Sequence, residues 1–241
     1  MKISVAQTRP VKGDIQSNID NHKKLIDLAV SCGADVIIFP ELSLTGYEPE
    51  LAQALAAHRD DGRFDVFQEI SDARQITIGV GMPTKTATLP CISMLLFQPR
   101  KARQMYSKKH LHSDEEPFFV SGQNSAGLMD ERKTALAICY ELSISEHAAN
   151  AFQSGAEIYV ASVAKTADGV GQAAERLSDI AAKYSMTVLM SNCVGHCDNF
   201  ESAGRTSVWN KNGLLVAQLD DTSEGVIVYN VETQEITERT L

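Results

Sequence analysis

The chain has 241 residues, of which 44% are hydrophobic and 22% are charged, so it has enough apolar material for a large folded core. Its formal net charge is −9, and the field of such a chain repels phosphate backbones and anionic membrane surfaces. No window approaches the roughly 20 consecutive apolar residues of a membrane span. We therefore expect no nucleic acid and no membrane among its partners.

The N-terminal segment and the cysteines both favour the cytoplasm. Residues 1–13 contain only a short apolar run before Thr8 and Arg9, which is not the apolar region of a signal peptide. The cysteines are odd in number and scattered along the chain, a pattern that does not fit a disulfide framework. We expect a soluble, cytoplasmic protein whose thiols are reduced.

Three possible metal ligands lie close together in one segment, Cys193, His196 and Cys197. Their spacing suits neighbouring zinc ligands, but no second cluster offers a fourth ligand. Ordinary packing or loop roles are the alternative that we favour. We therefore predict no metal site.

The first half of the chain alternates strand-like and helical patterns. Residues 2–6 form an apolar strand-like run, and Asp14 caps an amphipathic helical pattern that reaches about residue 31. Residues 34–42 follow as a continuous apolar run ended by Pro40, which is typical of a strand covered on both faces. This strand, helix and strand order predicts a parallel pair.

In the middle of the chain, the pattern changes from alternating strands and helices to neighbouring strands. A helical pattern over 50–75 leads into a strand at 76–83, and residues 91–99 and 102–107 predict antiparallel neighbours. A polar loop covers 108–123. Residues 125–138 indicate another hairpin, whose second strand leads into Cys139.

The last part of the chain returns to alternating helices and strands. We expect helices at 143–154 and 169–184, strands at 156–162 and 186–192, and a strand, turn, strand, turn, strand series over 205–231. There is no repeat and no flexible linker. The sequence predicts a single domain, residues 1–241, of mixed α/β class with helices outside and more than one sheet.

Three strongly polar residues each follow a strand-like run, Glu41, Lys108 and Cys139. Singly, each has an ordinary explanation, because charged residues after strands are usually solvated and a free cysteine is usually a small buried hydrophobe. Together they suit nucleophilic catalysis at a strand edge. A carboxylate in apolar surroundings can take the thiol proton, and an ammonium can stabilise the negative charge that builds on the substrate.

The segments FPELSLTGY, YSKKHL and ICYE resemble the three catalytic motifs of the nitrilase superfamily, the carbon-nitrogen hydrolases. The resemblance implies that Glu41 is the general base, Lys108 the oxyanion-stabilising lysine and Cys139 the nucleophile. Lys109 falls on a variable position of the motif and is expected to point elsewhere. The resemblance extends to KISVAQ, SNCVG and SVWNKNGLLV, so it spans nearly the whole chain.

The family also carries a second glutamate between the lysine and the cysteine. The segment DEEPFFVSG offers Glu115 and Glu116 for this role. The spacing to Phe118, Phe119 and Gly122 favours Glu115, and Glu116 stays open as the alternative.

The resemblance further implies a four-layer α-β-β-α sandwich and a homodimer formed through one outer helical layer. The chain also departs from the family pattern. Residues 142–145 lack the arginine that many members carry after the cysteine, and residues 161–170 lack a tryptophan. An absent guanidinium removes one way to hold an acidic substrate group, so these departures concern substrate choice.

The leading functional hypothesis is hydrolysis of a small non-peptide amide through a thioester on Cys139, with release of ammonia or an amine. Lys108 and the backbone N–H of Tyr140 would hold the oxyanion, and Glu115 would orient Lys108 or the attacking water. We expect no cofactor. Nitrile or carbamoyl-compound hydrolysis by the same residues and a non-catalytic binding member of the fold are the alternatives. A single sequence does not fix the pocket walls, so the substrate stays open.

Overall fold

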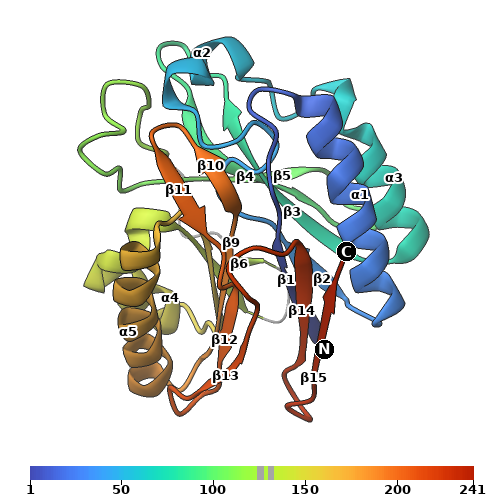
Figure 1. The fold of residues 1–241 in the computed structure, drawn as a ribbon, viewed down its shortest axis with the longest axis vertical. Coiled ribbons are helices and arrows are strands. Elements are labelled where there is room, and N and C mark those ends of the chain that lie inside the picture. The colour runs from blue at the N-terminus through green and yellow to red at the C-terminus, as the bar shows by residue number, and fades with distance from the viewer. Residues whose placement is uncertain (124–127, 130–132) are drawn as a thin grey trace.

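The computed structural model describes residues 1–123, 128–129 and 133–241, and in this part of the chain two large β-sheets pack face to face (Figure 1). The first sheet has seven strands in the order β15-β14-β1-β2-β3-β4-β5. Strands β1, β2 and β3 are parallel neighbours, and the other pairings in this sheet are antiparallel. Its strands are β1 (Lys2–Gln7), β2 (Val36–Ile38), β3 (Thr77–Thr84), β4 (Cys91–Phe97), β5 (Gln104–Ser107), β14 (Gly225–Asn230) and β15 (Ile236–Thr240).

The second sheet has the order β13-β12-β9-β8-β7-β6 in the described residues. Its central strands β7, β8 and β9 are parallel, and Ile138 at the end of β7 pairs with Ser162 of β8. A separate hairpin joins β10 (Val194–Cys197) to β11 (Phe200–Ala203). The strands of the second sheet are β6 (Leu128–Met129), β7 (Thr134–Ile138), β8 (Ile158–Val163), β9 (Thr187–Asn192), β12 (Ser207–Trp209) and β13 (Leu215–Gln218).

The helices lie on the two outer faces of the sheet pair. Figure 1 shows α1 and α3 on one side and α4 and α5 on the opposite side. The side chains of Asp14 and Thr166 cap α1 and α5 by accepting hydrogen bonds from backbone N–H groups of the first turn. The helices are α1 (Ile15–Ser31), α2 (Ala52–Leu55), α3 (Asp65–Arg74), α4 (Ser145–Gln153) and α5 (Ala167–Tyr184), with the 3₁₀ turns η1 (Pro49–Leu51), η2 (Gly62–Phe64) and η3 (Cys139–Ser143).

Three separate hydrophobic clusters show that the chain has four layers. The cluster between the two sheets includes Val5 of β1 and Leu136 of β7. A second cluster joins the first sheet to α1 and α3, and a third joins the second sheet to α4 and α5. Because side chains alternate along a strand, Val5 enters the cluster between the sheets and its neighbour Ala6 enters the helix-facing cluster. The predicted α-β-β-α sandwich is confirmed.

The helical pattern predicted over residues 50–75 is interrupted in the structure. Helix α2 ends at Leu55, the chain extends at Ala56, and helical structure resumes only at η2. The polar residues between them favour this break, because Asp61 accepts a hydrogen bond from the N–H of Arg63 and thereby caps η2. The hairpin expected over 125–138 is described only in part: β6 and β7 pair antiparallel, and residues 130–132 between them lie outside the described residues.

Candidate active site

The three residues singled out in the sequence each follow the end of a strand, and these strands belong to both sheets. Glu41 follows β2 and Lys108 follows β5 in the first sheet, whereas Cys139 follows β7 in the second. The Oγ of Ser162 in β8 donates to the carbonyl oxygen of Phe39 at 2.9 Å, so the two sheets are joined close to Glu41. The candidate site therefore forms where the two sheets meet.

Lys108 is at the centre of a buried charged cluster. Its Nζ donates to Oε1 of Glu41 at 2.8 Å and to Oε1 of Glu115 at 2.6 Å. The three side chains are 0%, 0% and 2% exposed, in the order Lys108, Glu41, Glu115. Glu116 is exposed, so the structure brings Glu115 and not Glu116 to this cluster.

Glu115 is fixed from three directions. Besides Lys108, the hydroxyl of Tyr47 donates to its Oε1 at 3.0 Å, and the backbone N–H of His112 donates to its Oε2 at 2.8 Å. A carboxylate with this many donors has little freedom to turn. Tyr47 is a residue of the site to which the sequence analysis gave no role, although it stands inside the FPELSLTGY motif.

The two oxygens of Glu41 differ in their surroundings. Oε1 accepts from Lys108, whereas Oε2 is buried and has no hydrogen-bond partner of standard geometry in the described part of the chain. The Cys139 thiol is close enough to contribute to the pKa of this carboxyl. Burial raises the pKa of Glu41 above its ordinary value, the charge of Lys108 opposes this, and Glu115 adds to the increase.

Cys139 occupies the turn from β7 into η3. Its φ is 44°, a left-handed conformation that a non-glycine residue rarely adopts and that is strained. Burial raises the pKa of its thiol to about 11, with a further increase from Glu41, while the charges of Lys165 and Lys108 lower it. The proton therefore rests on sulfur at neutral pH, and a base must remove it during attack.

Two positive charges influence the thiol. Burial alone would lower the pKa of Lys108, but the negative groups around it, Glu41 first, outweigh burial and the net pKa is raised. Lys108 therefore stays an ammonium. Lys165 follows β8, the parallel neighbour of β7, and the sequence analysis did not single it out. Parallel strands end at the same edge, which brings Lys165 near Cys139 although 26 positions separate them in the sequence.

The backbone near Cys139 offers a further donor. Tyr140 is the second residue of η3, and the first N–H groups of a helical turn have no partner inside that turn. Its ring lies edge-on to His112 with the centroids 5.1 Å apart. The N–H of Tyr140 is therefore placed to donate to a charged oxygen beside Cys139, and its role at an oxyanion stays a prediction.

The CxxHC segment does not gather its three polar side chains. The sulfurs of Cys193 and Cys197 are buried and 3.6 Å apart, whereas the side chain of His196 is 70% exposed and lies 3.9 Å from Glu201. Among the described residues, no three His, Cys, Asp or Glu side chains are grouped closely enough to hold a metal ion.

None of the helices in the described residues is long and apolar enough to cross a membrane.

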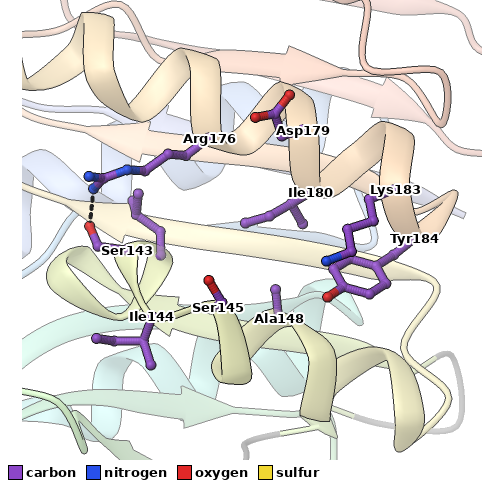
Figure 2. A pocket seen from close by; sticks show the side chains of 10 residues that line it. Ser143, Ile144, Ser145, Ala148, Arg176, Asp179, Ile180, Lys183 and Tyr184 are labelled. Atoms are coloured by element: carbon purple, nitrogen blue, oxygen red, sulfur yellow. Dashed lines mark hydrogen bonds between the residues drawn. The ribbon is translucent and has the colours of Figure 1, made fainter.

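A groove opens on the outer side of η3, away from the charged cluster. It lies between η3, α4 and α5, and Figure 2 shows Ser143 of η3 facing Arg176 of α5. Arg176 of α5 donates to the Oγ of Ser143. The groove contains neither Cys139 nor its partners, so it is a feature of the outer helical layer.

Comparison with families of known proteins identifies the class. Residues 2–240 match the family described as Carbon-nitrogen hydrolase. Because the match covers nearly the whole chain, the protein belongs to this family, the nitrilase superfamily, and is a hydrolase of that class.

The sequence identity to individual relatives is low, but the similarity covers most of this chain. "Hydrolase in agr operon" from Staphylococcus aureus is 25% identical over 232 residues, covering 93% of this chain and 88% of that protein. A nitrilase from Pyrococcus abyssi is 23% identical, with 96% and 90% covered. A glutamine-dependent NAD(+) synthetase from Xylella fastidiosa is 27% identical over 89% of this chain, which corresponds to 41% of the synthetase.

The solved structures that resemble this chain include an amidase from Nesterenkonia sp. AN1. Its complex with butyramide superposes with a TM-score of 0.86 at 22% identity, covering 95% of this chain and 89% of that chain. A structure of the same amidase after Michael addition of acrylamide at the active-site cysteine gives a TM-score of 0.88 at 21% identity, with 97% and 94% covered. At this level of identity the similarity establishes the fold.

Proposed function

We propose that the protein hydrolyses a small non-peptide amide through a thioester on Cys139, with Glu41, Lys108 and Glu115 completing the catalytic group. The observation that carries this proposal is the buried cluster in which Lys108 binds both carboxylates and leaves Oε2 of Glu41 without a hydrogen-bond partner of standard geometry in the described residues. A buried acceptor without a partner calls for an explanation, and a general base provides one.

Acylation begins with transfer of the Cys139 proton to Glu41 as sulfur attacks the amide carbon. Negative charge moves to the amide oxygen, where Lys108 and the N–H of Tyr140 stabilise it. An ammonium carries three N–H donors, and Lys108 uses two of them on Glu41 and Glu115, which leaves one for this oxygen. The carbon-nitrogen bond then breaks, and ammonia or an amine leaves with the proton that Glu41 returns.

Deacylation uses the same base. Glu41 takes a proton from water as the water attacks the thioester carbon, and the proton then passes to the departing sulfur. The product is a carboxylic acid, and the free thiol is restored. Glu115 holds Lys108 in place during both steps, because it is itself fixed by Tyr47 and by the N–H of His112.

A panel of amides, nitriles and carbamoyl compounds, with ammonia release as the readout, tests this function. We expect turnover of at least one small amide by the native protein and none by Cys139→Ala. Full turnover by the alanine variant on every substrate would overturn the proposal. Turnover of nitriles or carbamoyl compounds without amides would replace the substrate class and keep the catalytic group, and no turnover by the native protein would favour a binding role.

We propose in addition that two copies associate through the outer layer of α4 and α5. The groove in Figure 2 is lined by the partly buried Ile144, Ile180 and Tyr184 beside charged side chains of α5, a mixture that suits a protein interface. Light scattering gives the mass in solution, and we expect that of a dimer. An Ile180→Asp variant should shift the mass to that of a monomer, and an unchanged dimer would place the interface elsewhere.

A cytoplasmic location is part of the same proposal. All five cysteines are free, and free thiols are the usual state in a reducing compartment. Fractionation of the host cells, with this chain detected by immunoblotting, tests the compartment. Recovery outside the soluble cytoplasmic fraction would contradict it.

A further inference from the structure

A second buried carboxyl lies two residues after the nucleophile. Glu141 in η3 is 0% exposed. Its Oε2 accepts from the backbone N–H of Ile138 at 2.8 Å and from the hydroxyl of Tyr106 at 2.7 Å, and its Oε1 accepts from the backbone N–H of Lys109 at 2.7 Å. The catalytic steps proposed above make no use of this residue.

The three donors come from both sheets. Ile138 immediately precedes Cys139 at the end of β7, and Lys109 immediately follows Lys108, just after β5. Tyr106 belongs to β5 itself, two residues before Lys108. One carboxyl group therefore joins the two sheets at the points where the sulfur and the ammonium of the candidate site emerge.

A buried hydrogen-bond chain holds Glu141 from behind. The Nε2 of His147 lies 3.0 Å from the Tyr106 oxygen, and its Nδ1 lies 2.9 Å from the hydroxyl oxygen of Tyr159. Burial lowers the pKa of His147, so its ring is neutral near pH 7. Because the Tyr106 proton is donated to Glu141, Nε2 of His147 must donate to Tyr106 and Nδ1 must accept from Tyr159.

The hydrogen bonds of Glu141 can hold the strained backbone of Cys139 in place. Cys139 has a φ of 44°, and a conformation of this kind persists only when its surroundings hold it. The bond from Ile138 to Glu141 fixes the residue before Cys139, and the bond from Lys109 fixes the residue after Lys108. Rotation of either segment would change the separation between the sulfur and the ammonium.

We propose that Glu141 is a positioning residue that sets the separation of Cys139 and Lys108 by binding the backbone next to each of them. The inference rests on the catalytic roles proposed above. Glu141 does not touch the reacting atoms. It acts through the geometry of two residues that do.

Alkylation of Cys139 by iodoacetamide provides a test that needs no knowledge of the substrate. The rate constant at each cysteine is measured by peptide mass spectrometry for the native protein and for Glu141→Gln, Tyr106→Phe, Ser191→Ala and Glu41→Gln. In Glu141→Gln, the glutamine keeps the size of the side chain but offers one acceptor oxygen in place of two. Ser191→Ala is the matched control. Ser191 Oγ donates to the carbonyl oxygen of Ala6 at 2.6 Å, so this bond joins the same two sheets, and neither residue adjoins a member of the proposed catalytic group in the sequence.

We expect Glu141→Gln to slow alkylation at Cys139 by about 100-fold, the scale of a misplacement near 1 Å, and to leave alkylation at Cys32 unchanged. Tyr106→Phe keeps both backbone bonds and should slow it less. Ser191→Ala should lower the midpoint of thermal unfolding but leave the rate at Cys139 unchanged. On any amide that the panel identifies, Glu141→Gln should lower kcat with little change in KM, because Glu141 does not contact the reacting atoms.

The outcomes separate the two proposals. A rate at Cys139 that Glu41→Gln does not lower would contradict the proposed function, because burial keeps the pKa of this thiol at about 11 and Glu41 must take its proton. A rate at Cys139 that falls in Glu41→Gln but is unchanged in folded Glu141→Gln would overturn the positioning role. If Glu141→Gln does not fold, Tyr106→Phe decides: a native rate at Cys139 counts against the proposal, and a slower rate at an unchanged unfolding midpoint supports it.

Discussion

Glu41 in the candidate site and Glu141 behind it are both buried glutamates, and their carboxyl oxygens are satisfied in opposite ways. Glu41 lies beside a cation, Lys108, yet one of its oxygens has no hydrogen-bond partner of standard geometry in the described part of the chain. Among the residues that the structure describes, no lysine or arginine side chain forms an ion pair with Glu141, yet both of its oxygens accept hydrogen bonds. A satisfied carboxyl group holds its neighbours still, whereas an oxygen without a partner is ready to accept a proton. The comparison separates a reactive cluster from a supporting one.

The largest effect is expected from removing the open acceptor. Glu41→Gln keeps the side-chain volume but removes the base, so turnover should fall by about 10²- to 10⁴-fold. Alkylation of Cys139 should slow as well, because burial keeps the pKa of the thiol at about 11 and the proton needs an acceptor. Steady-state kinetics and iodoacetamide labelling measure the two effects.

Glu48→Gln is the control for this change, because Glu48 is buried but is paired with Lys12 at 2.6 Å outside the candidate site. It should leave both rates at the native level. Equal losses in the two variants would mean that any buried glutamate supports the fold in this way, and the distinction drawn above would fail.

Removing the cation should cost both activity and stability. Lys108→Met takes away the oxyanion donor, which typically lowers turnover by about 10²- to 10³-fold. It also leaves two buried carboxyl groups without their partner, a change that costs about 3 to 5 kcal/mol of unfolding free energy when one member of a buried pair is removed. Urea unfolding and ammonia release measure these effects.

Lys109→Met is the matched control, since Lys109 is partly exposed and the backbone N–H that binds Glu141 is retained. It should change neither turnover nor unfolding by a measurable amount. A large loss of turnover in Lys109→Met would show that the oxyanion role had been assigned to the wrong lysine.

The pH dependence follows from the raised pKa of Glu41. The carboxylate is the active base, so turnover should increase as pH rises through that pKa, which lies above the pKa of an ordinary glutamate.

The free energy of unfolding should change in the opposite direction. A carboxyl whose folded-state pKa is raised contributes stability that is full below its unfolded pKa and is lost as pH rises through the folded pKa. A pH series of kinetics and urea unfolding tests both signs, and a Glu41→Gln protein with the same rising limb would contradict the assignment.

The smallest effect concerns Lys165. Its charge lowers the pKa of Cys139, so Lys165→Met should raise that pKa further and slow alkylation at fixed pH by no more than about tenfold. Lys183→Met, in the groove of Figure 2, serves as the control and should have no effect. An alkylation profile that does not move in Lys165→Met would show that this charge does not reach the sulfur.

The sequence was sufficient to predict the strands that lead into the candidate site, and the resemblance selected four residues whose catalytic roles stay predictions. Glu41, Lys108 and Cys139 follow apolar runs that a short window reveals, and the structure brings the first two together with Glu115. The partners of Glu141 could not be predicted, because Lys109 and Tyr106 lie 32 and 35 positions away and only the packing of two sheets unites them. Strand β15 was also missed. Its residues are mostly exposed, so it carries no alternating apolar pattern.

The central claim is that the substrate becomes covalently attached to Cys139, and acid quenching during turnover tests it most directly. The protein is mixed with an amide that the panel identifies, denatured in acid within the first turnover, digested and examined by mass spectrometry. We expect the peptide containing Cys139 to carry the mass of the acyl group, and a larger fraction of adduct when deacylation is the slower step. Rapid turnover with the acyl group on another residue would contradict the account.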